Sequence, residues 1–168
     1  MRKRVLYLII VGLVLLVGSQ SYAQTSGTLT SSVVKQWGLT VVTLNWTSSD
    51  TGLTSQTISK AFQGCLVRMV YQPNGKTAPS DNWDCVLYDA NGQDILLGTG
   101  ANHDTANTES VYFDMNPSAA FTPVTVDTLN KFYTGFAVTT AGIHRLVVTN
   151  AGDAKKGHIK LYLRDPPM

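Results

Sequence analysis

Few residues in this 168-residue chain could do acid–base or nucleophilic chemistry. His103 and Asp104 stand together in a stretch rich in Gly, Asn and Thr, shortly before Ser110. A serine nucleophile needs a histidine base within reach and a third group that orients the base. The sequence has no Gly-x-Ser-x-Gly elbow, and His144 and His158 lie on strand faces expected to meet solvent. We therefore predict no catalytic residue, and interpret His103 and Asp104 as polar loop residues and candidate ligand contacts.

Paired carboxylates and metal ligands are also weakly represented. Asp81, Asp84, Asp89 and Asp94 are close in sequence, but nothing in their spacing indicates a glycosidase pair. The segment DANGQD at 89–94 is similar to the oxygen-rich start of a calcium loop, yet the later acidic ligand is missing. An Asn-Gly dipeptide in that segment is typical of a hairpin turn. We predict no metal site and no cofactor.

Aromatic side chains could instead stack on a sugar or contact another protein. Trp46 and Trp83 fall on apolar strand faces and are expected in the core. Tyr88, Tyr112 and Tyr162 fall on the wetter faces of their strands, which makes them the candidate contact residues.

The two cysteines favour a disulfide. If residues 63–72 and 83–90 form a hairpin centred on Gly75, then Cys65 and Cys85 lie directly opposite each other. Cα atoms at such a pair are about 4.5–5.5 Å apart, within disulfide range. The alternative is two buried free thiols. Without a matching set of histidines, they do not indicate a metal site.

These residues must be positioned by β-strands, because apolar and polar residues alternate repeatedly. Examples are Val42–Trp46, Val111–Met115 and Ile159–Leu163. The pattern predicts an all-β fold, an antiparallel β-sandwich of jelly-roll or Ig-like type, with a small barrel as the alternative. Residues 24–35 are interpreted as a polar lead-in, and residues 116–142 as a long connection.

The N-terminus predicts export. Three basic residues precede a 14-residue apolar run, Val5–Gly18, and Ser-Tyr-Ala then ends at residue 23. We interpret residues 1–23 as a signal peptide and 24–168 as one domain of the β-sandwich type, periplasmic or secreted. The run is shorter than a bilayer span, so no stable span is expected after cleavage, although a retained membrane anchor is the alternative. Of the 13 Lys and Arg, ten remain against 11 Asp and Glu, a net charge of −1, so net charge gives no support to a nucleic-acid partner.

Two stretches carry a family resemblance. The first contains PSDNWD at 79–84, DANGQD at 89–94 and GTGANHDTANTE at 98–109, and the second is LVVTNAGDAKKG at 146–157 with the strand after it. Together they resemble small, uncharacterised β-rich proteins encoded by tailed bacteriophages and prophages. The resemblance implies a non-catalytic structural or assembly domain, homo-oligomeric or bound to virion or surface proteins. An export signal departs from that pattern because tailed virions assemble in the cytoplasm. The alternatives are therefore a virion location, or an exported binding module for glycan or cell-surface ligands.

Overall fold

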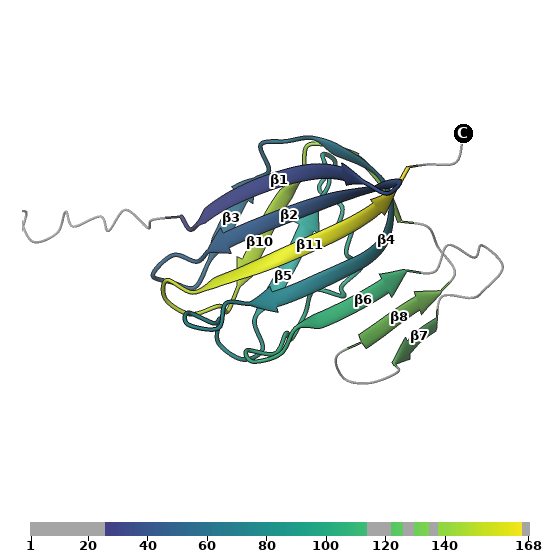
Figure 1. Cartoon of the computed structure of the whole chain (residues 1–168). Helices are drawn as coiled ribbons and strands as arrows, with labels where there is room; N and C mark the ends of the chain where they lie inside the picture. The colour runs from purple at the N-terminus through teal and green to yellow at the C-terminus, as the bar shows by residue number, and fades with distance from the viewer. Residues whose placement is uncertain (1–25, 114–121, 126–129, 135–137, 166–168) are drawn as a thin grey trace, which may run out of the picture.

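The computed structural model describes residues 26–113, 122–125, 130–134 and 138–165, and every regular element in these ranges is a strand (Figure 1). The all-β prediction is therefore confirmed. The predicted signal peptide, residues 1–23, lies outside the described residues. The strands are β1 (Thr28–Gln36), β2 (Leu39–Thr47), β3 (Thr54–Thr57), β4 (Phe62–Pro73), β5 (Asp84–Tyr88), β6 (Glu109–Phe113), β7 (Thr122–Thr125), β8 (Asn130–Thr134), β9 (Val138–Gly142), β10 (Arg145–Thr149) and β11 (Lys156–Arg164).

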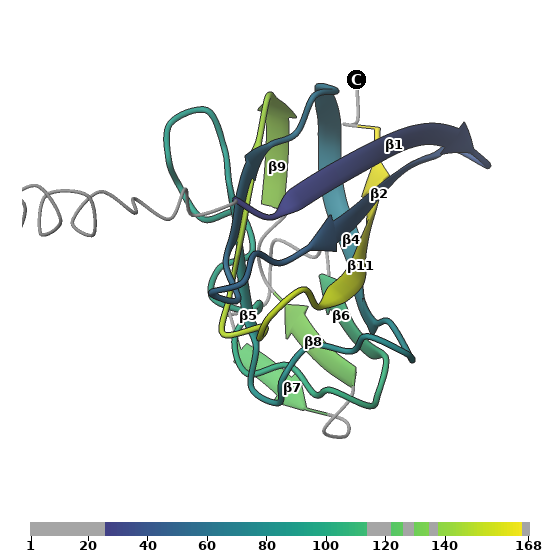
Figure 2. The ribbon, with the colours of Figure 1, turned by 90° about the vertical axis from the view of Figure 1, so that its left-hand side faces the viewer.

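The strands form two sheets that lie face to face (Figure 2). The larger sheet has the order β1-β2-β11-β4-β6-β8-β7, with β9 paired to β4, and the smaller sheet has the order β3-β10-β5. Neighbouring strands are antiparallel except β6 and β8, which are parallel. The described strands do not close into a barrel, because β1 and β7 stand at the two ends of the larger sheet.

The core lies between the sheets and follows the predicted alternation. Val42, Leu44 and Trp46 of β2 are at most 2% exposed, and so are the inward residues of β11. Trp46 packs against Trp83, with ring centroids 5.1 Å apart. Burial of each such side chain stabilises the fold by about 1.5–3 kcal/mol. The prediction that both tryptophans belong to the core is confirmed.

The predicted hairpin and its disulfide are wrong. After β4, residues 74–83 cross to the other layer, so β5 pairs with β10 and not with β4. A β-bulge at Val67 also reverses which residues of β4 point inward. Tyr162 pairs with Arg68 and Leu163 pairs with Leu66, so Val67 has no partner on β11 and the alternation shifts by one residue. Cys65 therefore lies outside the main core cluster, which includes Cys85. Its strand partner is Thr139 of β9. Both cysteines are buried free thiols.

Three further expectations are corrected by the strands. Residues 28–35, expected within the polar lead-in at 24–35, belong to the edge strand β1 (Thr28–Gln36). The expected long connection at 116–142 contains β7, β8 and β9, and Met115 lies outside the described residues. His144 does not meet solvent: it is 1% exposed and stacks on Phe62 with ring centroids 4.1 Å apart.

Candidate functional site

The loop that carries His103 is fixed against the start of β5. The His103 amide donates to the Trp83 carbonyl (2.9 Å), and the Asn82 amide donates to the His103 carbonyl (3.0 Å). These bonds turn the imidazole inward, where it is 1% exposed and lies against the rings of Tyr71 and Trp83. His103 is therefore a core residue rather than an exposed ligand contact.

The cluster anticipated around His103 is assembled with different partners. Ser110 is not beside the histidine; its hydroxyl accepts a bond from Arg68 (3.0 Å). Asp104 uses its carboxylate to accept bonds from the Ala106 and Asn107 amides, which hold its pKa below the usual range. Asp104 is thus a polar loop residue, as interpreted from the sequence, and its carboxylate is occupied by its own loop.

Glu109 is the acid that sequence inspection missed. Its carboxylate lies 3.0 Å from Nδ1 of His103 and accepts a bond from the Asp104 amide (2.5 Å). On the other side of the ring, Nε2 of His103 is 4.0 Å from Sγ of Cys85. Two features of the sequence could have drawn attention to Glu109. It is the chain's single glutamate, and it stands at the first position of an alternating strand.

The order Cys85–His103–Glu109 is that of a nucleophile, a base and an orienting acid. The chemical setting is unsuited to that role. Cys85 is 3% exposed, and burial raises the pKa of its thiol well above the usual range, which disfavours the reactive thiolate. A Cβ on Gly100 would lie 2.0 Å from the Cys85 carbonyl oxygen, so the loop is packed directly on the strand. The cluster can hold the 99–109 loop against β5, but it leaves no room for a substrate beside the sulfur.

The three candidate tyrosines do not form one site. Tyr112 and Tyr162 lie on the outer face of the larger sheet, on either side of Arg68, whose guanidinium carbon is 5.1 and 5.5 Å from their ring centroids. Tyr88 lies on the smaller sheet, 4.7 Å from the guanidinium carbon of Arg145. All three side chains are half-buried. Cation–π contacts of this kind stabilise by about 0.5–1 kcal/mol at exposed positions.

The most exposed aromatic residue is one that the sequence analysis did not select. Trp37 is 90% exposed and occupies the turn between β1 and β2, where it and Gly38 both have positive φ, 54° and 75°. In Figure 2 this hairpin projects beyond the rest of the larger sheet. Val34, on the same hairpin, is 54% exposed. A sequence signal existed: Trp37-Gly38 separates two runs of strand-forming residues.

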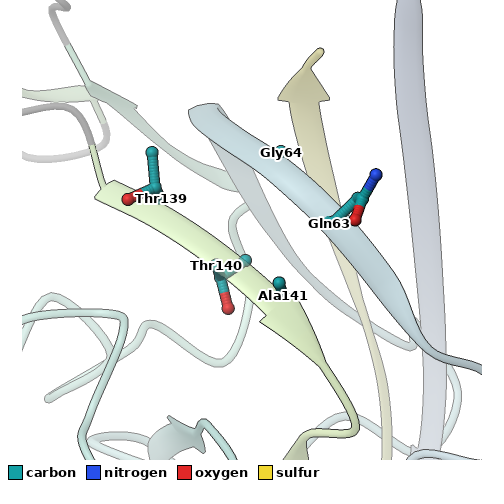
Figure 3. Close-up of a pocket in the computed structure, with 5 residues that line it drawn as sticks. All are labelled: Gln63, Gly64, Thr139, Thr140 and Ala141. Atoms are coloured by element: carbon teal, nitrogen blue, oxygen red, sulfur yellow. The ribbon is translucent and has the colours of Figure 1, made fainter. Parts of the chain in front are cut away.

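The described surface has more than one hollow. The first, of about 410 Å³, lies along β4 and β9 (Figure 3). Its lining residues are Gln63, Gly64, Thr139, Thr140 and Ala141, which include no ionisable side chain. The second, of about 300 Å³, lies where β1 begins and β2 ends. It is lined by Ser26, Gly27, Thr28, Thr47, Ser48, Ser49, Asp50, Asp153 and Ala154.

The calcium-like segment is an ordinary turn. Asp89 accepts bonds from the Asn91 and Gln93 amides, and Asp94 accepts bonds from the Leu96 and Gly98 amides, so their own loop occupies both carboxylates. Across the part of the chain that the structure describes, no group of three or more His, Cys, Asp or Glu is arranged to hold a metal ion. That same part contains no helix of the length and apolarity needed to cross a bilayer.

Among protein-family models and curated protein sequences, none matches this chain.

Proposed function

We propose that this chain is a non-catalytic structural or assembly domain that associates with copies of itself. We also propose that its two layers are a β-sandwich of jelly-roll or Ig-like type, exported and related in role to the phage-encoded proteins that it resembles. The observation that carries the assembly proposal is the 90% exposure of Trp37 on a projecting hairpin. Burial of an exposed indole is favourable by about 1.5–3 kcal/mol of free energy, so this position favours contact with another surface.

The edge strand β1 supports the same proposal. No described strand pairs with its outer side. Natural edge strands are commonly protected by proline, inward charges or several lysines. Strand β1 contains no proline, and Lys35 is its one charged residue. Among the described residues, the side-chain hydrogen bonds of β1 with the other layer fall in and before its first half. Nε2 of Gln56 donates to the Gly27 carbonyl (2.8 Å), and the hydroxyls of Ser31 and Ser59 are 3.4 Å apart. The half nearer Trp37 is therefore suited to contact.

Sedimentation equilibrium of the purified protein over a range of concentrations tests this function. We expect a concentration-dependent oligomer, and we expect Trp37→Ser to weaken association about 10- to 100-fold, the equivalent of one buried indole. Ile143→Ser is the matched control, because Ile143 is an exposed apolar residue (44%) away from the hairpin. A wild-type protein that stays monomeric at every concentration would contradict self-assembly.

A second candidate function is an exported binding module for glycan or cell-surface ligands. The stack of Tyr112, Arg68 and Tyr162 favours it, since aromatic faces beside a guanidinium suit sugar rings that carry a carboxylate. Binding to an array of neutral and acidic glycans tests this candidate. Tyr162→Ala should abolish any binding at this face, whereas Tyr88→Ala, on the other sheet, should leave it intact.

A further inference from the structure

The exposed hairpin tip and the second hollow lie at opposite ends of one two-stranded ladder. Strands β1 and β2 pair continuously from Gln36 opposite Leu39, beside the tip, to Thr28 opposite Thr47, in the lining of the hollow. Eight residue steps of antiparallel strand span about 27 Å. Figure 1 shows the two ends of this ladder at opposite sides of the larger sheet. One chain therefore carries a projection at one end of the β1–β2 ladder and a hollow at the other.

The two ends differ in charge. Near the tip, Lys35 has a side chain that is 75% exposed and forms an exposed ion pair with Asp165 (3.6 Å), a kind of contact that contributes at most about 1 kcal/mol. Arg164, exposed at the end of β11, lies opposite Leu39 on the same side. The hollow is lined by the carboxylates of Asp50 and Asp153 and by no basic side chain, although Lys155 follows just outside the lining.

We propose that the Trp37 tip of one copy enters this hollow on the next copy, so that the chain assembles head to tail. This inference rests on the proposed self-assembly and names its interface. The occupant is a second copy because the projection, the cavity and the complementary charges all belong to the same chain. The hollow also supplies what a buried indole requires, an acceptor for its N–H, in the carboxylates of Asp50 and Asp153.

A contact between two different surfaces does not close on itself in a dimer. Unless the rotation between copies happens to form a ring, it continues as an open chain. Successive copies would then be related by roughly the length of the β1–β2 ladder, about 30 Å. Because the charged groups are exposed, association should weaken as ionic strength rises.

Two complementary variants test the interface. The tip variant is Trp37→Ser, and the hollow variant is Asp50→Lys with Asp153→Lys; all three residues are exposed. Each variant alone should be monomeric under conditions in which the wild type assembles. Mixed in equal amounts they should form a one-to-one dimer that grows no further, because one intact tip and one intact hollow remain. Lys60→Glu, an exposed charge change on another loop, is the control and should assemble as the wild type does.

Fluorescence supplies a second readout that needs no variant to fold well. Trp46 and Trp83 are already buried, so a blue shift of wild-type emission with concentration should come from Trp37 alone. Wild-type assembly without that shift, or a mixture of the two variants that remains monomeric, would overturn the head-to-tail interface and leave self-assembly through another surface standing. A monomeric wild type would overturn both proposals.

Discussion

Glu109→Gln tests whether the buried His103–Glu109 pair is structural. The native carboxylate accepts from Nδ1 of His103 (3.0 Å) and from the Asp104 amide (2.5 Å), with 6% of its side chain exposed. An amide keeps the shape but has one acceptor oxygen, so one of the two donors faces an NH₂ group. An unsatisfied buried donor costs about 1–3 kcal/mol, and the loss of a charge-assisted bond adds to this. We expect a total loss of about 3 kcal/mol.

Urea denaturation followed by tryptophan fluorescence measures this loss, which corresponds to a fall of roughly 10 °C in melting temperature for a domain of this size. Asp94→Asn is the matched control, since Asp94 also accepts two hydrogen bonds, both from backbone amides, but is only half-buried. It should cost about 1 kcal/mol or less. A Glu109→Gln protein within 1 kcal/mol of the wild type would contradict a structural role for the pair, and would reopen a chemical role for the Cys85–His103–Glu109 cluster.

Three further outcomes follow from packing and burial. Gly157→Ala places a Cβ 2.5 Å from an indole ring and should cost about 1–3 kcal/mol in urea denaturation, whereas Gly75→Ala, with no atom within 4 Å, should be neutral or slightly stabilising. A thiol reagent should modify neither Cys65 nor Cys85 in the native protein, but both in denaturant without a reductant; fewer than two reactive thiols would indicate a disulfide. Burial lowers the pKa of His144 below 6.5, so the unfolded chain binds the proton first and stability should fall as pH drops through 6.5; His144→Gln should flatten that part of the pH profile.

The sequence predicted best where one strand face is buried along its whole length. In β2 and β11 the apolar residues alternate without interruption, and the structure buries the faces that the alternation selects. In β4, alternation alone would place Cys65 on the same face as Met69, but a single extra residue at Val67 reverses the faces on either side of it. A bulge of this kind leaves no distinctive residue type in the sequence, so alternation gives no sign of it.

The candidate site was harder to predict because it depends on contacts distant in sequence. The register that paired Cys65 with Cys85 assumed that neighbouring strands pair, whereas the chain crosses to the other sheet between them. Glu109 and His103 are close in sequence, but only the folded loop turns both side chains inward. The dipeptide Trp37-Gly38 indicates a turn. The exposure of Trp37, however, follows from the projection of the hairpin, which no local pattern specifies.

Hydrogen exchange at low and high protein concentration tests self-assembly most directly. We expect slower exchange at high concentration in two separate segments, residues 34–38 at the hairpin tip and residues 48–50 in the hollow, with the cluster around His103 unchanged. Exchange rates that are the same at both concentrations in both segments would contradict self-assembly.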